Sequence, residues 1–171
     1  KIKLLKNIPD NKTPFDFMRI RRHDNLLTQE DFMNKVITIE EITTQHRESG
    51  EMNMFSCMSV ITRCINETRF VASAENIGKL KPELQYISDK LRLDYDSILL
   101  LAVIVERGSM QRGCTCDDMC NQLGYTSLEF LVKRKSLQDM LKTRMIKAEK
   151  RMGRPEYQVT DQVISVLQND E

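Results

Sequence analysis

The chain has 171 residues, of which 40% are hydrophobic and 30% charged, and it contains only 6 glycines and 4 prolines. This length allows one ample domain or two small ones, and the composition excludes a disordered or fibrous chain. The formal net charge is only +1, so the charge of the whole molecule does not argue for nucleic acid or a membrane as a partner.

Basic residues are concentrated in one segment, residues 133–154. It holds nine basic residues against two acidic ones, Asp139 and Glu149, which gives it a local net charge of +7. Because the whole chain carries +1, the remaining residues must carry −6. This basic face could be a phosphate-binding surface, and the alternative is a solvated helix and hairpin.

The cysteine pattern indicates a reducing compartment. Five cysteines at irregular spacing, without a signal peptide, do not suit a disulfide framework, so we expect free thiols and a cytoplasmic location. The chain begins at Lys1 rather than Met, which predicts a piece of a longer protein whose missing part could carry a targeting segment. The longest apolar run, residues 98–105, is far shorter than the roughly 20 residues that span a bilayer, so no membrane partner is predicted.

The first part of the chain is predicted to be helical after a poorly structured start. Residues 1–25 contain Pro9 and Pro14 without a sustained apolar period, which indicates a linker or an arm that packs on something else. Thr28 and Asp31 suit the start of a helix that continues to about His46. Its apolar positions are Phe32, Val36 and Ile39.

Two more helices are predicted before residue 92. One apolar face is formed by Met54, Met58, Ile61, Ile65 and Ala72 at helical spacing. This spacing indicates a core face, although the ten methionines could also provide an adaptable surface for a partner. The second helix runs from Lys81 to Leu91 with Pro82 as its first residue, and Ser73 is an alternative cap in this region. Its buried positions are expected to be Leu84, Ile87 and Leu91.

The apolar run at 98–105 could by itself be a buried strand or a buried helix. The Asp94 cap before it, its leucines and Gly108 just past its end favour a helix. A short extended piece at 112–115 is followed by a two-turn helix, Cys116–Leu123, which Gly124 ends.

A basic helix is predicted next, from a capping box of Thr126 and Glu129 to about Lys142. Its inward face is expected to contain Leu128, Leu131 or Val132, Leu137 and Leu141. Lys133, Arg134 and Lys135 are expected to point outward.

A hairpin with a basic tip is expected to follow this helix. Residues 145–151 and 157–159 have the character of strands, and residues 152–155 have the composition of a tight turn. Thr160 or Asp161 is expected to cap a closing helix that contains Val163, Ile164 and Leu167.

This order of elements predicts a winged helix-turn-helix. Three helices, with a sharp glycine turn between the second and third and a hairpin directly after, are the parts of that fold. The predicted fold is therefore mainly α, with a helical N-terminal region at 1–90 and a winged-helix domain with a small β-hairpin wing at 91–171. Because the third helix and the wing present exposed faces, such a domain recognises a target rather than transforms it.

Residues 92–168 contain a leucine-rich first helix, the patterns DDMCNQLG, SLEFL and LQDMLKTRMI, and a closing hairpin. Together they resemble the winged-helix region that precedes the ATPase domain of bacterial AAA-type ATPases. The resemblance implies a non-catalytic recognition or regulatory N-terminal module, with its own ATPase domain or neighbouring subunits as partners. ATP and magnesium would bind in a missing C-terminal portion. The chain itself has no G-x-x-x-x-G-K-[ST] loop, since neither Gly108 nor Gly113 precedes a Lys-Ser or Lys-Thr.

The target of such a module could be a protein or duplex DNA, and the main alternative function is a DNA-binding transcriptional regulator. A solvated basic face is the structural alternative, and aromatic residues that could stack on bases are missing from it. Arg154, after Gly153, is the leading candidate for insertion at a groove or phosphate. The residues predicted to bind nucleic acid or a partner are Lys133, Arg134, Lys135, Gln138, Lys147, Lys150, Arg151 and Arg154.

Neither a metal site nor a catalytic centre is predicted in this chain. The spacing of Cys114, Cys116 and Cys120 does not match paired zinc ligands, and the histidines, His23 and His46, lie elsewhere. Several carboxylates lie at predicted helix starts, where capping explains them. They are Asp94, Asp96, Asp117, Asp118 and Glu129.

Overall fold

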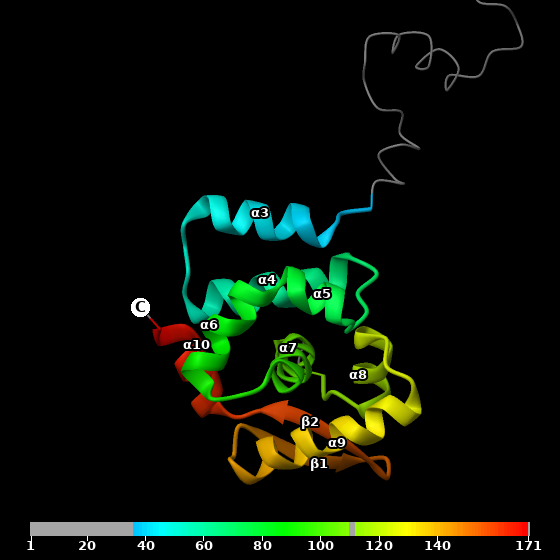
Figure 1. Cartoon of the computed structure of the whole chain (residues 1–171). Helices are drawn as coiled ribbons and strands as arrows, with labels where there is room; N and C mark the ends of the chain where they lie inside the picture. Colours follow the sequence, from blue (N-terminus) through cyan, green and yellow to red (C-terminus); the bar gives the residue numbers. More distant parts are fainter. Residues whose placement is uncertain (1–35, 110–111, 171) are drawn as a thin grey trace, which may run out of the picture. The chain divides into compact units, whose positions relative to one another are not determined.

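Polar caps and residues in the left-handed conformation set most helix boundaries of this protein. Its structure, a computed structural model, describes residues 36–109 and 112–170. In these residues the chain is mainly helical with a small antiparallel hairpin near its C-terminal end, in agreement with the sequence (Figure 1). In chain order the elements are α3 (Ile39–Ser49), α4 (Met54–Glu67), α5 (Ala74–Lys79), α6 (Lys81–Leu91), α7 (Tyr95–Ser109), α8 (Cys116–Leu123), α9 (Ser127–Lys142), β1 (Ile146–Arg151), β2 (Arg154–Val159) and α10 (Asp161–Asn169).

Helix α3 begins later than the sequence indicated. The expected start at Thr28 lies outside the described residues, but Val36, which was expected inside the helix, precedes it and is exposed. Thr38 is the cap, because its hydroxyl accepts a hydrogen bond from the Glu41 N–H at 3.2 Å. The helix also continues past His46, and Gly50, with φ 71°, closes it.

Helix α4 buries most of its predicted apolar face. The buried positions are Met54, Met58, Ile61 and Ile65, so both methionines belong to the core. Ala72, the fifth predicted member, lies beyond the end of the helix at Glu67, because the backbone turns extended at Thr68. At the other end Asn53 and Ser56 form a capping box.

Ser73 and Pro82 each lie at the start of a helix, whereas the sequence favoured Pro82 alone. Ser73 caps the short helix α5 by accepting a hydrogen bond from the Asn76 N–H. Helix α6 begins at Lys81, so Pro82 is its second residue rather than its first. Proline is tolerated there because amides of the first turn have no partner within the helix. Of the expected core positions, Leu84 and Ile87 are buried and Leu91 is half-buried.

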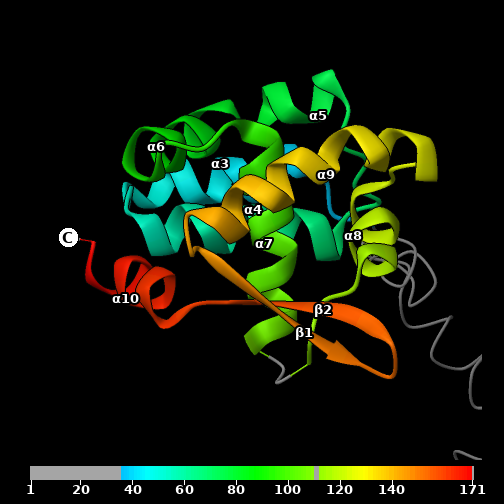
Figure 2. The same ribbon diagram turned by 90° about the horizontal axis from the view of Figure 1, so that it is seen from below.

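Helix α7 lies at the centre of the structure (Figures 1 and 2). Asp94 caps it as predicted, by accepting a hydrogen bond from the Ser97 N–H at 2.8 Å. Residues 98–104 are each 3% exposed or less, because α7 contacts α4, α6, α8, α9 and β2. A helix surrounded in this way needs no polar face, which explains the continuous apolar run. Gly108 is not past its end but inside it, where an added Cβ would lie 4.0 Å from a Val159 methyl carbon.

Helix α8, helix α9 and the hairpin follow the predicted boundaries closely. Gly124, with φ 67°, ends α8, and Thr126 with Glu129 forms the capping box of α9. The strands pair up to Arg151 opposite Arg154, so the turn is Met152 and Gly153 alone, shorter than expected. Their φ values of 50° and 78° belong to a two-residue turn whose twist matches that of the strands.

The extended piece before α8 pairs with the hairpin. Cys114 and Tyr157 form an antiparallel bridge in which each backbone N–H donates to the other carbonyl, at 3.0 and 2.7 Å. The two backbones approach so closely that a Cβ on Gly113 would lie 2.6 Å from the Cβ of Glu156. Glycine is therefore required at this position.

Helix α10 packs on α4. Of its predicted apolar positions, Val163 and Leu167 are buried but Ile164 is partly exposed. Thr160 occupies the cap position without capping, since its hydroxyl donates to the carbonyls of Arg144 and Met145 instead.

The chain end beyond α10 is joined to the first half by Asp170. Its carboxylate accepts hydrogen bonds from the Met54 N–H at 2.8 Å, the Tyr86 hydroxyl at 2.9 Å and the Lys90 ammonium at 3.0 Å. Residues 37–171 form one unit, and buried side chains from both halves share its core. The division of the chain at residue 90 stays a prediction. No helix among the described residues is long and apolar enough to cross a membrane.

Candidate binding surface on helix α9 and the hairpin

Helix α9 has an exposed apolar face as well as a buried one. Toward the core it buries Phe130, Leu137 and Met140. On the other side Leu128 is 75% exposed, Leu131 54% and Val132 74%. These three residues, which we call the α9 stripe, follow the spacing i, i+3, i+4 and therefore lie side by side. Isolated exposed hydrophobic residues are ordinary, but a contiguous group marks a surface with a binding role.

The predicted inward face of α9 was therefore wrong at its N-terminal end. Leu137 is buried and Leu141 half-buried as expected, but Leu128, Leu131 and Val132 are not in the core. Phe130 and Met140 take the inward positions, because α9 contacts α7 and β1 on that side. Apolar periodicity could not separate these faces, since both carry large apolar residues.

Lys133 lies between the two faces rather than pointing outward as expected. Its ammonium forms an ion pair with Asp96 and lies 5.7 Å from the centre of the Tyr125 ring. The Lys133 side chain is only 24% exposed. Burial, followed by the nearby Asp96 carboxylate, raises the pKa of Tyr125 above its usual range. Lys133 thus stabilises the contact between α9 and α7 and is poorly placed to bind a partner.

The other predicted binding residues of α9 are exposed: Arg134, Lys135 and Gln138. Lys135 continues the α9 stripe toward the C-terminal end, since it follows Leu128 by seven residues and Leu131 by four. Within the described part of the chain, no carboxylate lies at ion-pair distance from Arg134 or Lys135. The exposed side of α9 thus combines an apolar stripe with spare positive charge.

The hairpin holds the remaining predicted residues, which are Lys147, Lys150, Arg151 and Arg154, all exposed. Arg151 faces Glu156 at 3.6 Å, and Arg154 faces Asp117 of α8 at 3.8 Å. The Arg154 pair is solvent-exposed and contributes little to stability, whereas Glu156 of the Arg151 pair is half-buried. The tip itself is formed by Met152, which is fully exposed, so Arg154 lies just behind the tip.

Lys147 lines a separate groove of about 560 Å³ between α4, α7, α10 and the hairpin. The groove walls include Phe55, Val105 and Ile164, and Asp161 lies beside them. Because Lys147 lies at this groove, the predicted binding residues do not all belong to one surface.

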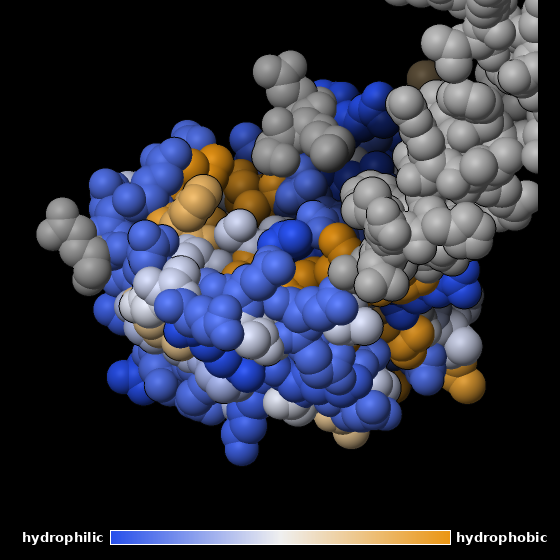
Figure 3. All heavy atoms as spheres, turned by 90° about the horizontal axis from the view of Figure 1, so that it is seen from above, coloured by the Kyte–Doolittle hydropathy of each residue, from blue (hydrophilic) through white to orange (hydrophobic). Residues whose placement is uncertain are grey.

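Hydrophobic side chains also reach the surface elsewhere. Figure 3 shows them gathered in patches among hydrophilic ones on the face seen from above.

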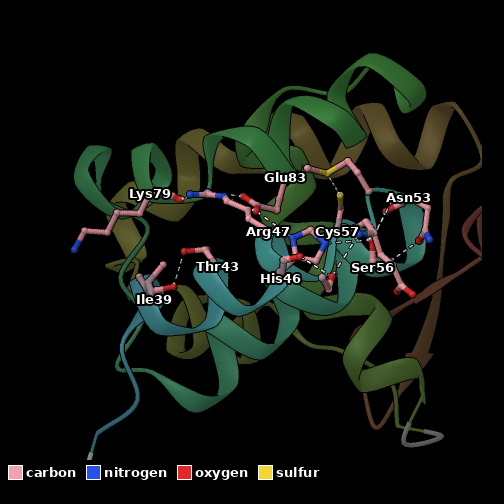
Figure 4. Close-up of polar contacts among 12 residues, drawn as sticks. Ile39, Thr43, His46, Arg47, Asn53, Ser56, Cys57, Lys79 and Glu83 are labelled. Carbon is pink, nitrogen blue, oxygen red and sulfur yellow. Dashed lines mark hydrogen bonds and ion pairs between the residues drawn. The ribbon is translucent and has the colours of Figure 1, made fainter.

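A buried polar network joins α3, α4 and α6 (Figure 4). The Glu83 carboxylate, fully buried, lies 3.2 Å from His46 Nδ1 and accepts hydrogen bonds from Arg47 at 3.0 and 3.1 Å. The other ring nitrogen, His46 Nε2, lies 3.2 Å from the Ser56 hydroxyl. Sequence reasoning missed this network, because its contacts join residues 10 to 37 positions apart and Glu83 resembles an ordinary first-turn acid.

Serine, histidine and glutamate in this order are the residue types of a nucleophilic triad. The Ser56 hydroxyl, however, is engaged in the α4 capping box: it accepts from the Asn53 N–H at 3.0 Å and contacts the Glu51 and Asn53 carbonyls. Arg47 also shares the Glu83 carboxylate. Because every polar group is already bound within the protein, the geometry favours a structural role that fixes α3 to the body.

All five cysteines are free thiols, with Cys57, Cys64 and Cys114 buried. Burial raises the pKa of the Cys57 thiol to about 11 and those of Cys64 and Cys114 to about 12, so these thiols stay protonated and unreactive at neutral pH. Among the residues that the structure describes, no group of three or more His, Cys, Asp or Glu side chains could hold a metal ion.

The predicted helix-start carboxylates divide into two groups. Asp94, Asp118 and Glu129 accept hydrogen bonds in helix caps. Asp96 and Asp117 instead face Lys133 and Arg154.

Comparisons of the chain with protein families, with curated proteins and with solved structures find no match.

Proposed function

We propose that residues 95–169 form a winged helix-turn-helix and that this module works by recognition. Support comes from the order of α7, the short α8, α9 and the hairpin, with Gly124 at the turn between α8 and α9. The antiparallel bridge between Cys114 and Tyr157 adds a short extended segment beside β2 and so connects the hairpin to the helices. In this arrangement α9 is the helix that meets a target.

The proposed target of α9 is a protein. The observation that carries this proposal is the α9 stripe, because Leu128, Leu131 and Val132 are exposed side by side on the recognition helix. Base edges in the DNA major groove offer mainly hydrogen-bonding groups, with the thymine methyl as the main apolar partner. A protein surface, by contrast, can bury three neighbouring aliphatic side chains.

The proposed context is the non-catalytic recognition module of an AAA-type ATPase, on the strength of the resemblance of residues 92–168 to such regions. Binding of a target at α9 would change the rate of ATP turnover in a downstream domain that binds ATP and magnesium. The sequence after Glu171 tests this directly. A strand, a phosphate-binding loop and a helix are expected there, and a stop codon would sink the ATPase context.

The functional test uses the longer protein with Leu131→Ser and Val132→Ser. Basal ATP turnover is expected to stay unchanged, while any stimulation by the target is lost. The matched control is Val166→Ser on α10, an exposed aliphatic residue outside the α9 stripe. If turnover responds equally in both variants, α9 is not the recognition helix.

A second candidate function, binding of duplex DNA, is favoured by the exposed basic residues of the hairpin. In that case affinity should fall steeply with salt and weaken when Arg151 and Arg154 become alanine. A fluorescent duplex of random sequence titrated at low salt checks it. Absence of binding under those conditions rejects this candidate.

A further inference from the structure

We infer that the α9 stripe and its basic neighbours dock an acidic amphipathic helix of a partner protein. This inference rests on the proposed role of α9 as the recognition helix. It goes further by naming the chemistry of the partner and its register on α9.

The apolar part of the surface suits a helix laid across α9. Recognition of an amphipathic helix uses anchors at spacings of three, four and seven residues. Leu128, Leu131 and Val132 provide positions i, i+3 and i+4, and Lys135 provides position i+7. The apolar ridge of the partner would therefore lie over the N-terminal half of α9, with a carboxylate opposite Lys135.

The charges around the stripe favour an acidic partner. Arg134 and Lys135 are exposed, and no described carboxylate is close enough to neutralise either of them. The two acids of α9 are already engaged: Glu129 holds the Thr126 N–H at 2.8 Å, and Asp139 faces Lys142 at 3.9 Å. Hydrogen bonding within the capping box lowers the pKa of Glu129, so this carboxylate is ionised at neutral pH, and the acids of a partner are expected opposite Arg134 and Lys135 rather than at the helix start. The α9 surface thus offers positive charge that a partner can satisfy.

The same charges disfavour the other occupants. Two copies of α9 packed in parallel would bring Arg134 and Lys135 of each chain together, and like charges in contact weaken association. An antiparallel pair, in which Lys135 would not face its own counterpart, is an outcome that sedimentation detects. Duplex DNA would satisfy the charges but leave the aliphatic stripe against a polar groove. An acidic helix with an apolar ridge satisfies both features at once.

The test uses the 171-residue chain and two synthetic helical peptides of about 18 residues, which is five helical turns. Both peptides carry the same leucine ridge, flanked by glutamates in one and by lysines in the other. Fluorescence anisotropy is expected to show at least about tenfold tighter binding of the glutamate peptide. Leu131→Ser with Val132→Ser should weaken its binding by about tenfold or more, and Lys135→Glu should shift the preference toward the lysine peptide.

Controls separate loss of the surface from loss of the fold. Val166→Ser should leave peptide binding unchanged, and all variants should keep the thermal transition of the parent because the substituted residues are exposed. Equal affinity for the two peptides, or unchanged binding in the α9 variants, overturns the inference. Two other results would also overturn it: self-association of the chain through α9 in sedimentation, and duplex DNA that displaces the bound peptide from α9. The sequence after Glu171 tests the ATPase context independently, so the two proposals can fail separately.

Discussion

Glu83 shows how one buried residue can determine the position of a whole helix. Its carboxylate is fully buried, and both of its cationic or polar partners from α3, His46 and Arg47, are needed to satisfy it. Removing one partner leaves part of the carboxylate without hydrogen bonds in a site that excludes water. Displacing α3 would therefore leave this carboxylate unpaired, in addition to exposing Ile39 and Ile42.

Arg47→Met is accordingly expected to lower the free energy of unfolding by about 2 kcal/mol, the value for a hydrogen bond to a charged group. The matched control is Arg63→Met, which removes two exposed contacts, the i, i+4 pair with Glu67 and a hydrogen bond to Gln45 of α3, and should cost less than about 1 kcal/mol. Urea unfolding followed by circular dichroism measures both. Equal costs for the two substitutions would show that the Glu83 network does not hold α3.

Asp170 links stability to acid pH. The Lys90 ammonium, the Tyr86 hydroxyl and the Met54 N–H hold the pKa of this carboxyl below its usual range. Because the folded pKa is lowered, the stabilisation is present above the usual value of about 3.9 and is lost as pH falls through the folded pKa. Asp170→Asn should therefore lower the free energy of unfolding at pH 6. The difference in this free energy between the variant and the parent should become smaller below about pH 3. Thermal unfolding at both pH values checks this, and a difference independent of pH would contradict it.

At the scale of elements, helix ends were predicted well because their signals are local. Gly50 and Gly124 show why, since both take φ near +70° and an L side chain there is strained. They differ in space: nothing lies within 4 Å of a Cβ added to Gly50, whereas one on Gly124 would meet a Val71 methyl at 3.2 Å. The two glycines thus separate backbone strain from crowding.

Gly50→Ala is expected to destabilise the protein by about 1 kcal/mol through backbone strain alone. Gly124→Ala should cost about 1 kcal/mol more, because Val71 must move to admit the new methyl. Chemical unfolding of the two variants under one set of conditions gives the comparison. If the two costs agree within error, Val71 adapts freely and the α8–α9 turn is less constrained than its geometry indicates.

Faces of elements were predicted less well than their ends. The capping box of Thr126 and Glu129 lies within four residues, so the sequence contains all that is needed to recognise it. Which side of α9 faces the core depends on its packing against α7 and β1, which the residues of α9 alone do not specify, because Leu128 and Phe130 are both strongly apolar. The same limit hid the contact of Lys133 with Asp96 and the Glu83 network, because each joins residues more than 30 positions apart.

For the whole molecule, α7 carries the connection between the two halves of the chain. Its residues 98–104 are buried on every side, by α4 and α6 from the first half and by α8, α9 and β2 from the second. Asp170 adds polar contacts from the chain end to α4 and α6. A segment cut at residue 90 would keep α7 but expose the apolar side chains that meet α4 and α6.

Residues 91–171 alone are therefore expected not to unfold cooperatively, whereas residues 37–171 should show a single transition. The physical reason is the area lost: each aliphatic side chain returned to water costs about 1.5–3 kcal/mol, and a small domain has a net stability of only about 5–15 kcal/mol. Urea unfolding monitored by circular dichroism distinguishes the two segments. A sharp transition for residues 91–171, together with dispersed amide resonances, would instead establish the winged helix as an independent domain with its boundary at residue 90.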